Sequence, residues 1–239
     1  METEKGAVLG IVGGMGPLAS AEFLRTIYRL HIVEPEQESP HCILSSNPTF
    51  PDRTAAIREG RTEILAERLS RAVENLVGLG ASRVVIACVT VHCVLASLPE
   101  TLRRKVVSLV DLTVDELLGS TAGPFLMLAT SGTCAARIFE SHERWGDVAE
   151  RVRFLDEGDQ KQLHTWIYRL KTGEPVAPFL DWIGSLRQRY DAGGLIFGCT
   201  ELHLLHELIA ARDNEDTCCG IIVDPLWIAA RDLRKILAP

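Results

Sequence analysis

Two cysteines in matching surroundings are the residues best suited to do chemistry. Cys88 follows the apolar run Arg83–Ala87, and Cys199 follows the run Gly194–Phe197. Each run has the composition of a buried strand, and each cysteine stands just before an expected helix. Backbone amides and the helix dipole at such a place favour anions and lower the pKa of a thiol from about 8.5 toward neutral. Each thiol is therefore a candidate acid or base.

A pair of opposed thiols suits the inversion of a carbon centre. One thiolate removes a proton from one face of the carbon, and the other thiol returns a proton to the opposite face. Either cysteine alone would more often be a core thiol, but the matched contexts favour function. Thr90 and Thr200 add hydroxyls at the same two turns. The other cysteines are expected to be buried thiols that pack as small hydrophobes: Cys42, Cys93, Cys134, Cys218 and Cys219.

Two histidines follow the cysteines at the same distance. His92 and His203 each lie four residues after a cysteine. Each has two interpretations that the sequence leaves open: a partner for the thiol or the substrate, or a histidine hydrogen-bonded between the two halves of the chain. One cysteine and one histidine per half, without a C-x-x-C pair, is a poor zinc signature, so no metal is expected.

A glycine-rich turn follows the first expected strand. In the stretch Gly10–Ala19, the residues Gly14, Gly16 and Ala19 fit the G-x-G-x-x-A fingerprint of dinucleotide sites. Pro17, however, removes a backbone amide where the helix begins. We therefore favour a tight turn whose amides approach a small carboxylate over a dinucleotide site.

The loop Ser46–Thr54 is a second candidate for substrate binding. Its two prolines fix its path and present Asn47 and Arg53 with little entropy to lose. Arginine is suited to bidentate carboxylate binding. The plain alternative is a surface arginine that pairs with Asp52 or Glu59.

The second half of the chain offers an equivalent turn and a second cation. Thr130, Ser131 and Thr133 form a hydroxyl-rich turn suited to a substrate carboxylate. Lys171 ends the amphipathic stretch 159–170, where a lysine is more often solvated than functional.

The elements that would position these residues are short apolar runs alternating with amphipathic stretches, of which 61–79 is the clearest helix. The pattern predicts an α/β fold with mainly parallel sheets. The echo between the two cysteine segments predicts two similar lobes that face each other. We assign residues 1–108 plus 213–239 to the first lobe and 109–212 to the second. Eight runs are expected to be strands: Ala7–Val12, Cys42–Ser45, Arg83–Ala87, Val106–Leu109, Phe125–Ala129, Val152–Leu155, Gly194–Phe197 and Gly220–Val223.

Composition excludes several classes of protein. The 239 residues are 46% hydrophobic and carry a net charge of −7, so disorder is excluded and nucleic acid is an unexpected partner. No apolar run approaches the ~20 residues that a bilayer span needs, so no membrane partner is expected. The N-terminus does not resemble a signal peptide, and the seven cysteines lack the spacing of a secreted disulfide scaffold. We expect a cytoplasmic protein.

Five motifs in chain order resemble the aspartate/glutamate racemase superfamily, and within it the branch of aspartate racemases and broad-specificity amino-acid racemases. The resemblance runs from Gly10 to about residue 230. It implies two α/β lobes related by a pseudo-two-fold axis, with the active site between them, and racemisation without a cofactor such as pyridoxal phosphate. The motifs are G-G-M-G-P at 13–17, N-P-x-x-P-D-R-T at 47–54, C-x-T-x-H at 88–92, A-T-x-G-T at 129–133 and G-C-T-E at 198–201.

The resemblance also implies roles for individual residues. Cys88 and Cys199 would be the two acid/base thiols, supported by Thr90 and Thr200. The substrate, a small amino acid or dicarboxylic acid, would bind in a homodimeric enzyme. Its pocket would be lined by Met15, Asn47, Thr130 and Thr133, and its carboxylates would be bound by Arg53 and Lys171.

One position departs from the family pattern. The family's first cysteine motif is C-N-T, whose asparagine contacts the substrate, and this chain has Val89 there. Valine cannot hydrogen-bond an amino or carboxylate group, so the substrate could differ from aspartate. Two alternatives stay open: a superfamily relative that decarboxylates or isomerises a small dicarboxylic acid, and a catalytically silent ligand-binding protein.

Overall fold

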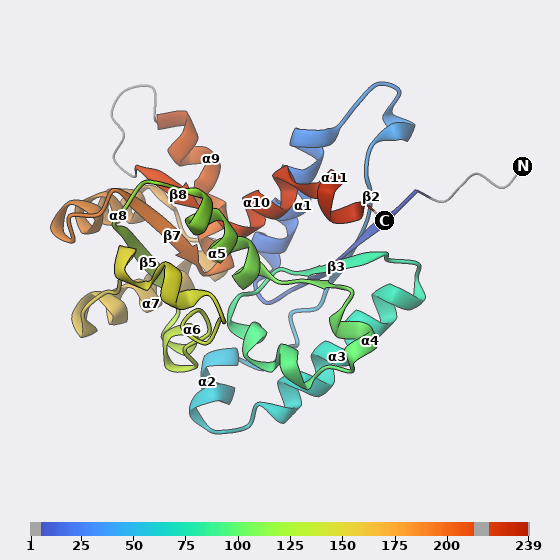
Figure 1. The fold of residues 1–239 in the computed structure, drawn as a ribbon, viewed down its shortest axis with the longest axis horizontal. Coiled ribbons are helices and arrows are strands. Elements are labelled where there is room, and N and C mark those ends of the chain that lie inside the picture. Colours follow the sequence, from blue (N-terminus) through green and yellow to red (C-terminus); the bar gives the residue numbers. More distant parts are fainter. Residues whose placement is uncertain (1–5, 213–219, 239) are drawn as a thin grey trace, which may run out of the picture.

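Two matching parallel sheets form the framework of the molecule (Figure 1). The computed structural model describes residues 6–212 and 220–238, and over these residues each sheet has four strands. The first sheet has the order β2-β1-β3-β4, with β1 (Val8–Gly13), β2 (His41–Ser46), β3 (Arg83–Ile86) and β4 (Val106–Val107). The second has the equivalent order β6-β5-β7-β8, with β5 (Phe125–Ala129), β6 (Val152–Arg153), β7 (Gly194–Gly198) and β8 (Ile221–Val223). The predicted fold class is confirmed.

Helices cover both sheets, because the connections between parallel strands must cross their faces. In α3 (Glu63–Gly78), the residues Leu65, Leu69, Val73 and Leu76 form a fully buried stripe against the first sheet. The other helices are α1 (Pro17–His31), α2 (Arg53–Arg58), α4 (Glu100–Arg103), α5 (Leu109–Gly119), α6 (Ser131–Ala135), α7 (Glu157–Lys171), α8 (Ala177–Arg189), α9 (His203–Arg212), α10 (Pro225–Arg231) and α11 (Leu233–Leu237). Short 3₁₀ turns follow both cysteines, at Thr90–Ser97 and Thr200–Leu202.

A shared apolar core joins the two lobes. One cluster of buried side chains includes Ile11 and Val85 from the first sheet as well as Phe125 and Met127 from the second. Near it, α10 packs against α1 and α5, and α2 packs against α6 (Figure 1). The carboxyl ends of β3 and β7, where the two cysteines stand, are thus held in fixed relation to each other.

The C-terminal strand differs from its expected place in the first lobe. β8 pairs with β7 through the register Leu195↔Ile222 and completes the second sheet, as β4 does for β3 in the first sheet. The α10 helix that follows does return to α1. The expected boundary at residue 213 lies outside the described residues.

The cysteines away from the candidate site are less buried than expected. Cys42, Cys93 and Cys134 are free thiols of intermediate exposure. Burial raises the pKa of all three thiols to about 11. Cys218 and Cys219 lie outside the described residues.

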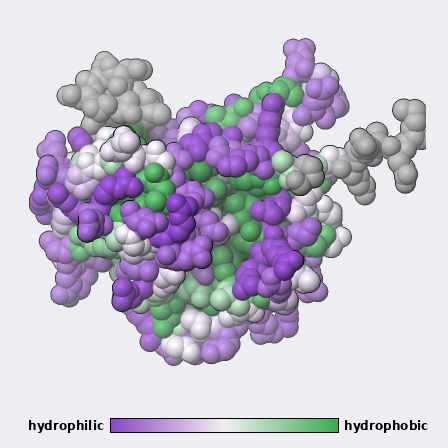
Figure 2. Space-filling view, in the orientation of Figure 1, coloured by the Kyte–Doolittle hydropathy of each residue, from purple (hydrophilic) through white to green (hydrophobic). Residues whose placement is uncertain are grey.

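The surface is mostly hydrophilic. Figure 2 shows apolar side chains gathered in a hollow between the C-terminal helices and the first sheet. A groove of about 460 Å³ at the β4 edge has Val106, Leu112 and Ile236 in its lining, together with the charged residues Asp111 and Lys235. Within residues 6–212 and 220–238, no helix is long and apolar enough to cross a bilayer.

Candidate functional site

The glycine turn after β1 makes room for neighbouring parts of the chain. Gly14 has a φ of +90°, and a Cβ there would lie 2.3 Å from the carbonyl carbon of Asn47. A Cβ on Gly16 would lie 2.7 Å from Oε1 of Glu201. The fingerprint glycines therefore admit the backbone of the 47–54 loop and a buried carboxylate, which accounts for them without a dinucleotide.

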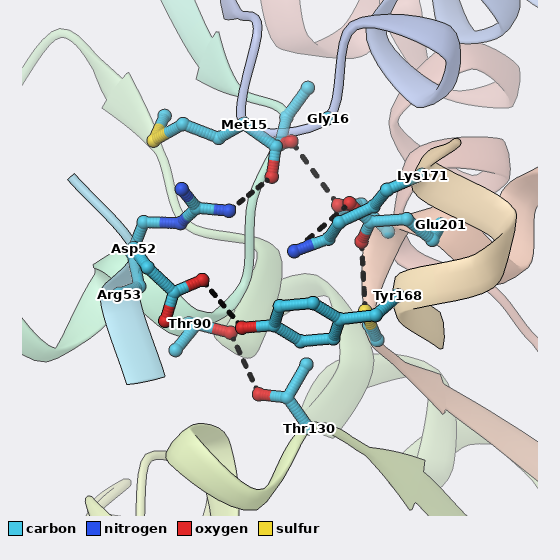
Figure 3. A network of polar contacts seen from close by, with 12 residues as sticks. Met15, Gly16, Asp52, Arg53, Thr90, Thr130, Tyr168, Lys171 and Glu201 are labelled. Atoms are coloured by element: carbon cyan, nitrogen blue, oxygen red, sulfur yellow. Dashed lines mark hydrogen bonds and ion pairs between the residues drawn. The ribbon is translucent and has the colours of Figure 1, made fainter. Parts of the chain in front are cut away.

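Arg53 is a buried cation fixed by backbone carbonyls. It begins α2, where its Nη2 donates to the carbonyl of Met15 (2.8 Å) (Figure 3). Its Nη1 donates to the carbonyl of Pro51 (3.1 Å). Within the described part of the chain its buried Nε has no hydrogen-bond partner. Burial alone would lower the pKa of Arg53, but electrostatic interactions with Cys88 and Glu201 outweigh it and raise that pKa. Arg53 thus places a permanent charge beside Cys88.

Three threonines from both lobes form a closed triangle. The Oγ1 atoms of Thr90, Thr130 and Thr133 each lie 3.0 Å from the other two. Thr130 also caps α6, because its Oγ1 accepts from the backbone amide of Thr133 (3.1 Å). Each hydroxyl has one hydrogen to donate, and the three hydroxyls now bond one another. An anion bound at this triangle would accept these hydrogen bonds instead.

The backbone carbonyl of Cys88 is hydrogen-bonded to a neutral histidine, His92. Nε2 of His92 accepts from the backbone amide of Leu109 (3.1 Å), so its Nδ1 carries the hydrogen donated to the carbonyl of Cys88 (2.9 Å). Burial is the main cause that lowers the pKa of His92 to about 4. His92 thus positions the backbone of Cys88, and its contact is with the carbonyl rather than with the thiol.

The thiol of Cys199 is hydrogen-bonded to a carboxylate rather than to the backbone amides of a helix N-terminus. Its Sγ donates to Oε2 of Glu201 at 2.9 Å, and both residues are buried. Burial and the charge of Glu201 raise the pKa of Cys199 well above its ordinary value, against a lowering by Lys171. The lowered pKa expected from the helix dipole is therefore not found at Cys199, because burial and a like charge act more strongly than a short 3₁₀ turn.

Lys171 is largely buried within the site rather than solvated. Its Nζ lies 3.6 Å from Oε1 of Glu201 and 4.4 Å from the ring centre of Tyr168 (Figure 3). Its side chain is only 18% exposed. Burial alone would lower the pKa of Lys171, but Glu201 and Cys199 raise it, so the ammonium stays charged.

His203 has a structural place between the lobes. Its Nδ1 donates to Oδ2 of Asp224 at 2.6 Å, and its Nε2 lies 3.0 Å from the hydroxyl of Thr26 on α1. Asp224 in turn caps α10. The two contacts join α9 to α1 and α10. No group of three or more potential metal ligands was found among the described His, Cys, Asp and Glu residues.

The remaining expected site residues fall into two groups. Thr200 donates to the carbonyl of Ala87 (3.2 Å), next to Cys88, and the buried Met15 contributes the carbonyl that holds Arg53. Asn47 is exposed, and its Oδ1 accepts from the amide and hydroxyl of Thr49 (3.0 and 2.8 Å). Its carboxamide therefore closes its own loop and is not part of the polar network at the thiols.

Two residues that contact the candidate site residues, Glu201 and Tyr168, were not predicted from the sequence. Glu201 stands in the G-C-T-E motif two residues after Cys199, which was the available signal. Tyr168 precedes Lys171 by three residues and so shares its helix face. Its hydroxyl donates to Asp52 across the lobes at 2.5 Å (Figure 3).

Comparisons with known proteins agree with this architecture. The chain is similar to an aspartate racemase from Picrophilus torridus, with a TM-score of 0.76 and 22% identity over 96% of this chain and 94% of that one. It is similar to a putative Asp/Glu racemase from Yersinia pestis, with a TM-score of 0.71 and 21% identity over 97% and 99%. A glutamate racemase from Campylobacter jejuni subsp. jejuni shares the fold with a TM-score of 0.63 and 15% identity over 95% and 85%.

A family model extends the agreement from fold to sequence. The model for Asp/Glu/hydantoin racemases matches residues 12–233, which include both cysteines, both cations and the threonine triangle. The chain therefore belongs to the Asp/Glu/hydantoin racemase family.

Proposed function

We propose that the protein is a cofactor-independent amino-acid racemase of the aspartate racemase type, in which Cys88 and Cys199 exchange the Cα proton from opposite faces. The observation that carries this proposal is the equivalence of the two thiols. Each is buried and follows a central strand of its sheet, β3 or β7, which hold the same place in the two strand orders. A carbon held between the two lobes would meet one sulfur from each.

The two buried cations suit a dicarboxylic amino acid. Arg53 and Lys171 are mostly buried and stay charged, so each offers a carboxylate a stronger interaction than an exposed cation would. The same cations stabilise negative charge that develops when the Cα proton leaves. The threonine triangle adds hydroxyl donors on the side of α6.

Val89 bears on the identity of the substrate. It is 1% exposed and belongs to the apolar cluster that joins the lobes, and its side chain offers no polar atom to a substrate. We propose that acidic amino acids such as aspartate are among the substrates and that polar contacts to the amino group come from other residues. As further proposals, the enzyme acts in the cytoplasm as a homodimer.

The decisive experiment is a racemisation screen in deuterium oxide. Both enantiomers of all proteinogenic amino acids are incubated with the protein. Products are separated by chiral chromatography, and their deuterium content is measured by mass spectrometry. We expect inversion with solvent deuterium at Cα and no release of carbon dioxide. Release of carbon dioxide from a dicarboxylic acid would instead indicate a decarboxylase, and inertness toward every compound would favour a silent binding protein.

Cysteine variants test the two-base assignment in the same assay. Cys88→Ser and Cys199→Ser should each reduce racemisation by several orders of magnitude, because a serine hydroxyl is a far weaker acid than a thiol at neutral pH. Cys42→Ser is the matched control, since it alters a free thiol on β2 outside the network. Near-native racemisation by either active-site variant would contradict the assignment.

A further inference from the structure

The carboxylate of Glu201 contacts the sulfur of Cys199 and not that of Cys88. Glu201 is 3% exposed, and its Oε2 lies 2.9 Å from Sγ of Cys199. A carboxylate has no hydrogen to donate, so the hydrogen in this contact belongs to the thiol. Among the described residues, no hydrogen bond reaches Sγ of Cys88, and the positive charge of Arg53 acts on it instead.

We infer that Glu201 is a positioning residue that holds the proton on Cys199, so that the protein meets its substrate with Cys199 as the proton donor and Cys88 as the acceptor. This inference rests on the proposed function for its catalytic meaning, but the protonation state itself is a property of the free protein. The two halves of the chain are alike in fold, and Glu201 makes the two thiols unlike in chemistry.

The other charged groups around the pair do not cancel this effect. Lys171 on α7 pairs with the opposite oxygen of the carboxylate, Oε1, at 3.6 Å, so the anion faces the sulfur directly. Arg53 on α2 is held by the carbonyls of Met15 and Pro51 and acts on both Glu201 and Cys88. In agreement with this geometry, burial and Glu201 raise the pKa of Cys199 more than Lys171 lowers it.

The resulting proton transfer is balanced in atoms and charge. The Cys88 thiolate takes the Cα proton, and the electron pair of the broken C–H bond stays on carbon. The S–H bond of Cys199 then breaks, its proton forms the new C–H bond on the opposite face, and its electron pair remains on sulfur. This thiolate lies beside a carboxylate, so the protein returns to its resting form when Cys199 gains a proton from water and Cys88 gives one up to water.

Thiol labelling of the free protein tests the inference without any substrate. A small neutral alkylating reagent such as iodoacetamide is applied over a range of pH, and mass spectrometry gives the rate at each cysteine. Only the thiolate reacts, and dividing each rate by its own high-pH plateau removes differences in accessibility. In Glu201→Gln, we expect the labelling midpoint of Cys199 to fall, with about tenfold or more faster relative labelling at neutral pH. The relative labelling of Cys42 on β2, a free thiol away from Glu201, should not change.

Three further variants make the result specific. Glu201→Asp keeps the charge and should restore a high midpoint at Cys199. Lys171→Met removes the opposing cation and should raise that midpoint further. Glu207→Gln removes a carboxylate on α9 that pairs with Arg29 at the surface and should change nothing. An unchanged Cys199 midpoint in folded Glu201→Gln, or a fall in Lys171→Met, would overturn the inference.

The labelling result and the racemisation screen can fail separately. If the midpoints move as expected but no amino acid is racemised, the proton assignment stands and the proposed function falls. If the wild-type protein racemises amino acids while the Cys199 midpoint is the same with Glu or Gln at position 201, the enzyme assignment stands and this inference falls.

Discussion

Tyr168 of the second lobe donates a 2.5 Å hydrogen bond to Oδ2 of Asp52 in the first lobe. The other oxygen of Asp52 accepts from the backbone amide of Ala55 and caps α2, the helix that begins with Arg53. The tyrosine ring also lies against the ammonium of Lys171. One phenol therefore connects the helices that carry the two cations, and it fixes their separation.

Removal of this hydroxyl should weaken substrate binding more than it slows the chemistry. In Tyr168→Phe, the half-buried bond to Asp52 is lost, which we expect to cost about 1 kcal/mol and to raise KM about fivefold. Steady-state kinetics with the amino acid found in the screen gives KM and kcat separately. Tyr190→Phe is the control, because that hydroxyl bonds Asp159 within the second lobe. Equal effects of the two substitutions on KM would contradict a bridging role.

Arg53→Ala should discriminate between acidic and neutral substrates. Loss of a charge-assisted contact costs about 1.5–3 kcal/mol, so KM for an acidic amino acid should rise about tenfold or more. A neutral amino acid, which has one carboxylate fewer, should be affected much less. Arg58→Ala, an exposed residue on the same helix, serves as the control. If acidic and neutral amino acids lose binding equally, Arg53 does not contact the second carboxylate.

His92 should make the fold sensitive to moderate acid. In the unfolded chain it takes up a proton near pH 6.5, but burial delays this uptake to about pH 4 in the folded protein. Between these values the unfolded state binds more protons, so the free energy of unfolding falls as the pH falls. Its contribution is present above pH 6.5 and is lost progressively on the way down, by about 3 kcal/mol at pH 4.

Urea unfolding at neutral and acidic pH checks this prediction. His92→Gln removes the titrating group, so the variant should lose less stability on acidification than the wild type. His41→Gln, at an exposed histidine on β2, should behave like the wild type. An identical pH dependence in His92→Gln and wild type would show that another group causes the acid sensitivity.

Gly14→Ala should be strongly destabilising for two separable reasons. A positive φ costs an L-residue about 1–2 kcal/mol, and the contact with the Asn47 backbone adds about 1–3 kcal/mol for overpacking. Gly60→Ala is the matched control, because Gly60 has a φ of +65° but no atom within 4 Å of the place that a Cβ would take. In denaturant titrations, Gly60→Ala should lose only the free energy of unfolding that the positive φ costs, and Gly14→Ala should lose more. Equal losses would show that the 47–54 loop moves aside without cost.

Most of the fold was predictable because buried parallel strands leave a local signature. The run Phe125–Ala129 is apolar throughout, and β5 has the same bounds. At the run 106–109 a local cap decides the bound: β4 ends at Val107, because Ser108 accepts from the amide of Asp111 and starts α5 at Leu109. The placement of β8 was not predictable in this way, since it depends on which sheet edge is open after the helices have packed.

The candidate site was predictable where chemistry repeats along the chain and unpredictable where the lobes meet. Cys88 and Cys199 stand out because their segments echo each other. Asn47 was expected in the pocket, but its side chain bonds the next turn of its own loop. Glu201 stands only two residues after Cys199, so the G-C-T-E motif offered a signal for it, but its ion pair with Lys171 could not be read from that motif. The contact of Tyr168 with Asp52 joins residues distant in sequence, so no local pattern distinguishes Tyr168 from an ordinary helix residue.

The packing of α2 against α6 leaves no room for a side chain at their contact. Thr54 on α2 sits so near Gly132 on α6 that a methyl group on the glycine would lie 2.6 Å from the threonine hydroxyl. Both thiols are almost inaccessible to solvent, at 4% and 3% exposed. Any side chain larger than hydrogen at position 132 would push α2 away from α6, and with it Arg53, the residue that begins α2.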